Sequence, residues 1–314
     1  MNFVLALLLL LAQPSDALLF ARARAYTENG QFQQAIELWQ EMTERHPDRV
    51  DAWAYLALAF RRQESFDLAD RTVDHALEVD RESSRALWQR GLLRNLQQRP
   101  AEALDAFDLL QVKAAKQATF HYQRGVALQL LDRVEEATQA MRAAVDRDPE
   151  LFAAQYSLYL LLRSDDPAAA RAQLEQVEVL RDRQPDWVRN DQLRLEAGPL
   201  SDMDWPNAYL GLRAKGEGEL YRLQLEGVRS RPDGVGAIVE FWTGDALLRR
   251  RYDESPLSFR IRKGETIEVL RILWPNGMVQ NVLGIDPTQL PDGTLRVREE
   301  LFIKGSWGGV KIQD

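Results

Sequence analysis

The stretch Gly30-Gln-Phe-Gln-Gln-Ala-Ile-Glu-Leu-Trp39 returns in altered form as Asp132-Arg-Val-Glu-Glu-Ala-Thr-Gln-Ala-Met141. Its alanine is one of four that lie 34 residues apart: Ala35, Ala69, Ala103 and Ala137. A column of small residues lies twelve positions before them, and a column of bulky apolar residues lies four positions after them: Ala23, Ala57, Gly91 and Gly125, then Trp39, Val73, Phe107 and Met141. Small residues let paired helices approach closely, and the bulky residue plugs the gap between units. The period therefore predicts stacked helix pairs.

This pattern resembles the tetratricopeptide repeat, a helix-turn-helix unit of about 34 residues. Four units cover about residues 17–151, and a fifth, less regular unit runs from Phe152 to about Pro185. An atypical last unit is expected, because a terminal unit caps the stack. The resemblance implies an α-solenoid over residues 18–185.

The resemblance also implies that certain first-helix positions line the concave face on which such solenoids bind their partners. Reading those positions gives the candidates Phe20, with Arg24 in the same helix, Leu58, Arg61, Arg62, Trp88, Leu92, Asn95, Tyr122, Val126, Gln129, Tyr156, Leu160 and Arg163. This groove is apolar and aromatic in its middle and has arginines toward both ends, which suits an extended or helical peptide with apolar anchors. Two alternatives remain. The aromatic side chains belong to the core, or the chain's own linker fills the groove.

The helical pattern fades after Pro185, and residues 186–208 read as a linker with Gly198-Pro199 and Trp205-Pro206. Beyond it, alternating apolar and polar residues predict strands at 220–228, 237–243, 246–252, 257–261, 266–273 and 278–283, with one or two more within 294–303. We therefore expect an α+β protein with separate domains, in which residues 209–314 form an antiparallel β-sandwich or barrel.

Two motifs in this region resemble the ASPIC/UnbV domain over roughly residues 209–285. Gly227-Val-Arg-Ser-Arg-Pro-Asp-Gly-Val-Gly-Ala-Ile-Val239 is similar to its G-x-x-S-N-R-x-G-I-G-A-x-V signature, and Leu273-Trp-Pro-Asn-Gly-Met-Val-Gln280 is similar to its W-P-N/S-G-x-x-Q hairpin. The motif residues are Arg229, Ser230, Asp233, Gly234, Gly236, Trp274, Pro275, Asn276 and Gly277. Arg231-Pro232 departs from the usual Asn-Arg. The family implies an extracytoplasmic module and brings no established chemistry with it.

The first residues predict a signal peptide over residues 1–17. The apolar run Phe3-Val-Leu-Ala-Leu-Leu-Leu-Leu-Leu-Ala12 fits a secretory hydrophobic region, and the small residues Ser15 and Ala17 suit cleavage after Ala17. The alternative is a buried first helix of the domain that follows. No later segment approaches the ~20 apolar residues of a membrane span. We expect a periplasmic or secreted protein without a membrane span in the mature chain.

The composition narrows the function classes. The chain of 314 residues has a net charge of −8, no cysteine and only three histidines, His46, His75 and His121. These numbers exclude disulfides and thiolate chemistry and argue against a basic footprint for nucleic acid. The carboxylate pair Glu299-Glu300 has no acid–base partner in the sequence. We expect no catalysis, no metal and no cofactor, but a scaffold that binds a protein or peptide in its groove and uses the β domain as a second contact surface.

The alternative is a carbohydrate- or ligand-binding module tethered by the helical array. Trp242, Trp274 and Trp307 would then offer stacking faces to a sugar. The run Arg249-Arg250-Arg251 could contact an anionic ligand, although an exposed strand end is the simpler interpretation.

Overall fold

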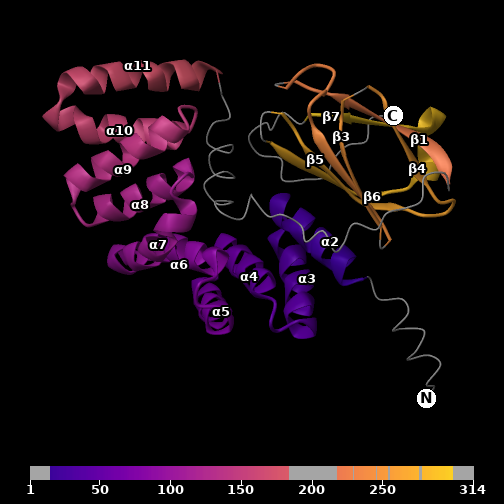
Figure 1. Cartoon of the computed structure of the whole chain (residues 1–314), viewed down its shortest axis with the longest axis horizontal. Coiled ribbons are helices and arrows are strands. Elements are labelled where there is room, and N and C mark those ends of the chain that lie inside the picture. Colours follow the sequence, from indigo (N-terminus) through magenta and orange to yellow (C-terminus); the bar gives the residue numbers. More distant parts are fainter. Residues whose placement is uncertain are drawn as a thin grey trace. The chain divides into compact units, whose positions relative to one another are not determined.

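The computed structural model describes residues 15–183 and 218–299, apart from positions 229, 245, 254, 276 and 277. The predicted linker at 186–208 and the first fourteen residues of the predicted signal peptide lie outside the described residues. The chain divides into two compact units: Met1–His46 with Asp204–Asp314, and Pro47–Met203. The first helix pair therefore belongs to the same unit as the C-terminal strands (Figure 1).

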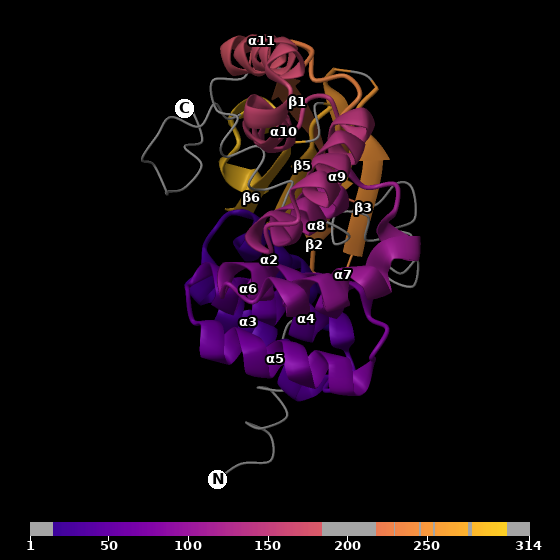
Figure 2. The ribbon, with the colours of Figure 1, turned by 90° about the vertical axis from the view of Figure 1, so that its left-hand side faces the viewer.

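The described part of the chain contains ten helices in five consecutive pairs. They are α2 (Asp16–Glu28) with α3 (Phe32–Arg45), α4 (Val50–Arg62) with α5 (Phe66–Val79), α6 (Ser84–Leu96) with α7 (Pro100–Ala114), α8 (Ala118–Leu130) with α9 (Val134–Arg147), and α10 (Phe152–Asp165) with α11 (Pro167–Arg183). The members of a pair lie side by side, as Figure 2 shows for α8 with α9 and for α10 with α11. The predicted helix pairs are thus confirmed.

Each of the first four pairs turns through one residue of left-handed backbone at the same place in the repeat. Gly30, Glu64, Gln98 and Asp132 have φ angles of 73°, 58°, 57° and 57°. The next amide donates to the carbonyl five residues back, as Ser65 N does to Phe60 O at 2.9 Å. This closure satisfies carbonyls at the end of the first helix and sends the chain into the second.

The residue columns that define the period fill the core of the pairs. Ala35, Ala69, Ala103 and Ala137 are each 0% exposed. A Cβ atom at Gly91 would lie 2.3 Å from the Phe107 ring, and one at Gly125 would lie 2.8 Å from the Met141 methyl. The small residue and the bulky residue therefore meet within one pair, whereas the spacing predicts the bulky residue between units. Phe107 does reach the next pair, where its ring centroid lies 6.2 Å from that of Phe120.

Seven strands in the described residues form two sheets. Their bounds are β1 (Glu219–Glu226), β2 (Ile238–Thr243), β3 (Ala246–Arg251), β4 (Leu257–Ile261), β5 (Ile267–Leu273), β6 (Val279–Ile285) and β7 (Thr294–Arg298). Two 3-10 turns, Pro287–Gln289 and Pro291–Gly293, precede β7. The sheets have the orders β4-β1-β7 and β3-β2-β5-β6. The first six strands begin and end within two residues of their predicted bounds.

Strand β7 differs from the expected antiparallel arrangement. It runs parallel to β1, with Leu225 beside Val297, whereas the other four pairings between described strands are antiparallel. β1 and β7 are the first and last strands of the sheets, so no hairpin joins them. Turn residues and the alternation of apolar and polar residues predict only pairs of strands that a short turn joins. They therefore do not predict the parallel pair of β1 and β7.

The two sheets share one apolar core, which makes the region a β-sandwich. Leu223 and Phe259 come from one sheet, and Phe241 and Leu270 come from the other; all four are at most 3% exposed. The rings of Phe241 and Phe259 stack across the core with centroids 4.5 Å apart. The predicted sandwich is therefore confirmed, with one parallel pair inside it.

Helix α2 packs against β5 and β6 through a polar network centred on Glu28. Arg271 Nε and Nη2 donate to the Glu28 carboxylate at 3.0 and 3.1 Å, and Asn281 Nδ2 donates to it at 3.0 Å. Arg24 Nε lies 2.9 Å from the same carboxylate. Arg271 Nη1 also lies 3.5 Å from Glu240, so the network continues onto β2.

The charges of this network set the protonation of Glu28. Burial would raise the pKa of Glu28, but the attraction of Arg271 and then Arg24, with hydrogen bonds from Arg271 and Asn281, lowers it to about 2. The carboxylate is therefore ionised at neutral pH. It neutralises Arg24 and shares the neutralisation of Arg271 with Glu240.

Candidate partner-binding surfaces

The N-terminal part of the predicted groove is closed. Phe20, Leu58, Trp88 and Leu92 are 1%, 7%, 0% and 4% exposed. The Phe20 and Trp39 rings contact each other with centroids 4.9 Å apart. The Trp88 and Phe107 rings lie in the core of the second unit with centroids 5.7 Å apart. For these two aromatic residues the core interpretation holds, because their rings have no surface left for a partner.

The polar members of the same part brace neighbouring repeats. Arg61 Nε donates to Gln89 Oε1 at 3.2 Å, and Asn95 Nδ2 donates to Gln123 O at 3.0 Å. Both bonds join first helices of successive pairs, and Arg61 and Asn95 are 6% and 7% exposed. Arg24 belongs to the Glu28 network. Only Arg62 in this part is half-buried.

The C-terminal part of the predicted groove is open. Tyr122, Val126 and Gln129 on α8 are half-buried, and Arg163 on α10 is exposed. Tyr156 and Leu160, also on α10, are 43% and 39% exposed.

An apolar cluster supports this open part from beneath. Tyr122 and Val126 pack against the cluster that contains Met141 and Leu158. The Tyr156 ring is positioned by Phe152, with centroids 6.2 Å apart. The first helices α8 and α10 thus present accessible apolar and aromatic side chains. We call these positions the α8–α10 surface: Tyr122, Val126, Gln129, Tyr156, Leu160 and Arg163.

The β-domain motif residues build a tight loop. Asp233 is exposed, and its Oδ1 accepts from Val235 N at 3.1 Å. Gly234 has a φ of 68° and would place a Cβ 2.5 Å from the Cβ of Leu225, so a side chain is excluded there. Gly236 has a φ of 104° and lies near Pro275, which is exposed. Arg229, Asn276 and Gly277 lie outside the described residues.

Glu299 organises this loop, a role that no sequence pattern around it indicates. Its carboxylate accepts from Val228 N at 2.7 Å, from Ser230 N at 2.9 Å and from Ser230 Oγ at 3.3 Å. Glu299 is 4% exposed and lies 69 residues from Ser230. No local pattern connects two positions so far apart. Among the described residues, the signature loop is thus held by a buried carboxylate.

The tryptophans proposed for sugar stacking are closed as well. Trp242 and Trp274 are 1% and 2% exposed, and Trp274 Nε1 donates to Gln280 Oε1 at 3.0 Å. Trp307 lies outside the described residues. Neither described ring offers a face to a ligand.

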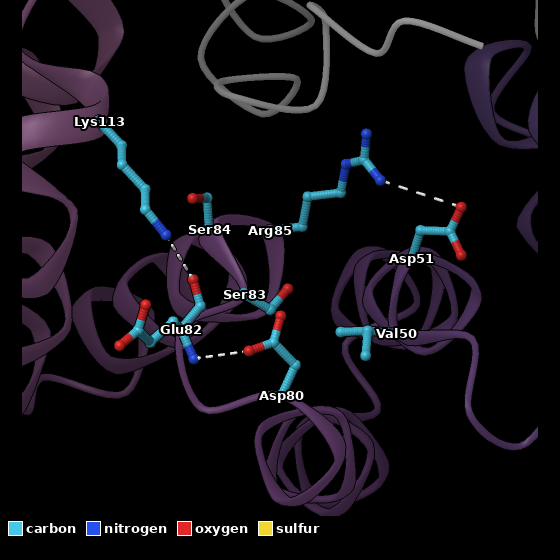
Figure 3. A pocket seen from close by; sticks show the side chains of 8 residues that line it. All are labelled: Val50, Asp51, Asp80, Glu82, Ser83, Ser84, Arg85 and Lys113. Carbon is cyan, nitrogen blue, oxygen red and sulfur yellow. Dashed lines mark hydrogen bonds and ion pairs between the residues drawn. The ribbon is translucent and has the colours of Figure 1, made fainter. Parts of the chain in front are cut away.

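A polar hollow of about 400 Å³ lies between the ends of α4, α6 and α7 (Figure 3). Lys113 Nζ donates to Glu82 O at 3.1 Å, and Glu82 N donates to Asp80 Oδ1 at 3.0 Å. Arg85 Nη1 lies 3.9 Å from Asp51 Oδ2. These charged groups therefore interact with the protein itself, and the described residues that line the hollow include no nucleophile hydrogen-bonded to a base.

Neither a metal centre nor a membrane span is found in the described part of the chain. No three histidine, aspartate or glutamate side chains in it are grouped so that they could hold a metal ion. None of its helices is both long enough and apolar enough to cross a bilayer.

Burial lowers the pKa of His121, whose Nε2 lies 2.9 Å from Ala115 O.

Family models of the tetratricopeptide repeat match residues 20–70, 60–119 and 118–151. The helix pairs over residues 20–151 are therefore tetratricopeptide repeats. The matched residues end before α10, the helix that carries Tyr156 and Leu160.

Solved structures of other proteins resemble the chain over about half its length. MamA from Desulfovibrio magneticus RS-1, from residue 41 to its end, has a TM-score of 0.49 at 20% identity, covering 54% of this chain and 96% of that one. YrrB, a TPR protein described as having an unusual peptide-binding site, has a TM-score of 0.42 at 18% identity, covering 56% of this chain and 87% of that one.

Proposed function

We propose that the protein is a non-catalytic scaffold that binds a protein or peptide partner on the α8–α10 surface. The observation that carries this proposal is the exposure of Tyr156 and Leu160 on α10, together with the partial exposure of Tyr122 and Val126 on α8. Exposed aromatic and aliphatic side chains on the first helices of two successive pairs suit the apolar anchors of a peptide, because burying them on binding removes apolar surface from water. The tetratricopeptide repeats support the same class of function.

The test compares two pairs of exposed apolar residues in the full-length protein. Tyr156→Ala with Leu160→Ala removes the anchors of the α8–α10 surface. Leu109→Ala with Val112→Ala is the matched control, because these residues of second helix α7 are 67% and 92% exposed. In pull-downs, we expect the first variant to lose partners that the wild type and the control recover, while all three have the same helical circular dichroism. Equal recovery by all three would refute the proposal.

The β-sandwich is the second contact surface in this proposal. We assign it to the ASPIC/UnbV family on the two motifs of residues 227–239 and 273–280, and Glu299 holds the first of these in shape. By sequence pattern, the proposed division of the chain is a helical domain over 18–185, a linker over 186–208 and a β domain over 209–314. By compactness, the first helix pair of that helical domain belongs with the strands. No observation favours carbohydrate binding, since the Trp242 and Trp274 rings are buried.

The proposal places the protein in the cell envelope or outside the cell, after removal of a signal peptide. The proposed cleavage point after Ala17 lies inside α2, beyond its N-cap Ser15 and its first residue Asp16. Cleavage there would remove Asp16, whose carboxylate accepts a hydrogen bond from Arg45 Nη1 at 3.2 Å and lies 2.6 Å from His46 Nε2. The intact mass of protein recovered from a periplasmic extract tests the proposal. A mass that retains residues 1–17 would contradict it.

A further inference from the structure

Strand β3 forms one edge of the four-stranded sheet and has two chemically distinct halves. The sheet order is β3-β2-β5-β6, so β3 pairs with β2 on one side and with no described strand on the other. Its sequence is Ala246-Leu-Leu-Arg-Arg-Arg251, apolar in the first half and basic in the second. An edge strand presents unpaired backbone N–H and C=O groups to any chain that can lie beside it.

The arginines differ in how far their charge is already neutralised. Arg249 Nε lies 3.3 Å from Glu240 Oε1, and that glutamate also neutralises Arg271. Arg250 and Arg251 are exposed and make no ion pair with the described residues. Side chains alternate along a strand. Arg250 therefore shares the face of Leu248, which packs on the sandwich core, and Arg251 lies on the opposite face.

Open space lies beside the basic half of the strand. A hollow of about 490 Å³ is lined by Gly236, Ile238 and the three arginines. Ile238 is the register partner of Arg251 across β2, and Gly236 N donates to Tyr252 O just past the end of β3. A chain entering along β3 would therefore meet positive charge on both of its faces before it reached the apolar half.

We propose that the outer edge of β3, which pairs with no described strand, binds an extended peptide segment of a partner protein as an added antiparallel strand, with acidic residues first and apolar residues after them. Antiparallel pairing places the start of the incoming segment beside Arg251 and its end beside residues 246–248. Backbone hydrogen bonds supply affinity, while the carboxylates opposite Arg250 and Arg251 set the register and direction. The inference rests on the proposed role of the β-sandwich as a second contact surface and names the partner chemistry.

The test uses a fluorescent peptide, Asp-Glu-Asp-Val-Leu-Val, and a peptide of the same composition in alternating order, Asp-Val-Glu-Leu-Asp-Val. Fluorescence anisotropy with the full-length protein should show tighter binding of the first peptide. Arg250→Glu with Arg251→Glu should weaken that binding by at least about tenfold, because it replaces two attractions by repulsions. Arg222→Glu with Lys263→Glu is the control, since both are exposed in the same domain and change the net charge equally. The control should bind as the wild type does.

A second measurement locates the peptide. Amide exchange of Leu247 to Arg251 should slow when the acidic-first peptide is bound, because new strand hydrogen bonds protect N–H groups at the edge. Equal binding of both peptides, unchanged exchange in β3, or unchanged affinity of the Arg250 and Arg251 variant would overturn the proposal. So would competition by a DNA oligonucleotide at equal charge concentration, which would indicate a general anion site.

One outcome would assign the arginines a different role. If the Arg250→Glu, Arg251→Glu variant self-associates in sedimentation experiments but keeps its peptide affinity, the charges guard the edge against pairing between copies, and the proposal is wrong. The helical scaffold is tested separately by the Tyr156 and Leu160 pull-down. Loss of β3 binding with an intact pull-down result would therefore remove this inference and leave the scaffold in place.

Discussion

The left-handed turn residues show at the scale of single residues how the repeats use one backbone solution with different side chains. Gly30 adopts a positive φ at the first turn, but Glu64, Gln98 and Asp132 adopt it in the next three. Left-handed backbone costs a residue with a Cβ roughly 1–2 kcal/mol. The repeats tolerate this cost because the helix-ending hydrogen bonds at each turn compensate for it.

Replacing Gln98 by glycine should therefore stabilise the protein. Gln98 is exposed, so the change removes little besides the strained Cβ. We expect Gln98→Gly to raise the free energy of unfolding by about 0.5–1 kcal/mol in urea titrations, after the entropic cost of glycine is subtracted. The reciprocal change, Gly30→Ala, should lower it by about 1 kcal/mol. Shifts of the same sign for both variants would contradict the strain argument.

The two buried glycines of the helices, Gly91 and Gly125, should respond differently to replacement by alanine. Gly91→Ala places a Cβ 2.3 Å from Phe107, whose ring is packed between Trp88 and Phe120 and is 0% exposed. Overpacking should outweigh the gain in helix propensity and lower the free energy of unfolding by about 1–2 kcal/mol. A Cβ at Gly125 comes closest to the end of the Met141 side chain, which can change its rotamer, and lies 3.3 Å from the Cβ of Ala140. Gly125→Ala should therefore stay within about 1 kcal/mol of the wild type. Equal losses measured for both in urea titrations would contradict this account.

At the scale of elements, the contact of α2 with β5 and β6 depends on ionised Glu28. Because the pKa of Glu28 is lowered to about 2, its contribution to the free energy of unfolding is fully present above about pH 4.5 and is lost as the pH falls toward 2. A shift of this size corresponds to about 3 kcal/mol. The side chain is 22% exposed, so solvent screens the network only in part.

Glu28→Gln should show this dependence directly. We expect the variant to lose about 3 kcal/mol of unfolding free energy at pH 7, and the difference from the wild type to shrink toward zero as the pH approaches 2. Glu37→Gln is the control, because Glu37 is exposed on α3 and, among the described residues, accepts a hydrogen bond from Gln33 alone. Denaturant titrations across this pH range measure the effect. A difference that does not change with pH would refute the assignment of the stabilisation to the charge of Glu28.

At the scale of the whole molecule, the first helix pair and the strands should open together. They belong to one compact unit although Glu28 and Arg271 are 243 residues apart in the chain. Hydrogen exchange reports such cooperative units. Glu28→Gln should therefore speed exchange in α2, α3, β5 and β6 together, while α8 to α11 keep their wild-type rates. Faster exchange confined to α2 would show that the helix pair opens independently of the sheet.

Much of the fold was predictable because its signals are local. A period of 34 residues is repeated along the chain, and the strand positions follow from alternation within a few residues. The candidate groove was predictable as a set of positions but not as a surface. Trp88 and Tyr156 both occupy first-helix positions of that set, yet one is 0% and the other 43% exposed. Burial depends on what neighbouring helices bring, which no column of the repeat encodes.

The sequence by itself determined the helix pairs, the residues that pack inside them and the positions of the strands, including β7 within 294–303, since spacing and alternation act over short stretches of chain. Only the tertiary structure decided that β7 runs parallel to β1, that Glu299 holds the loop at Ser230, and that Glu28 joins the first helix pair to β5 and β6. Each of these contacts joins positions far apart in the chain. The physical reason is that such pairs form by burial and charge neutralisation in three dimensions, for which the sequence has no period.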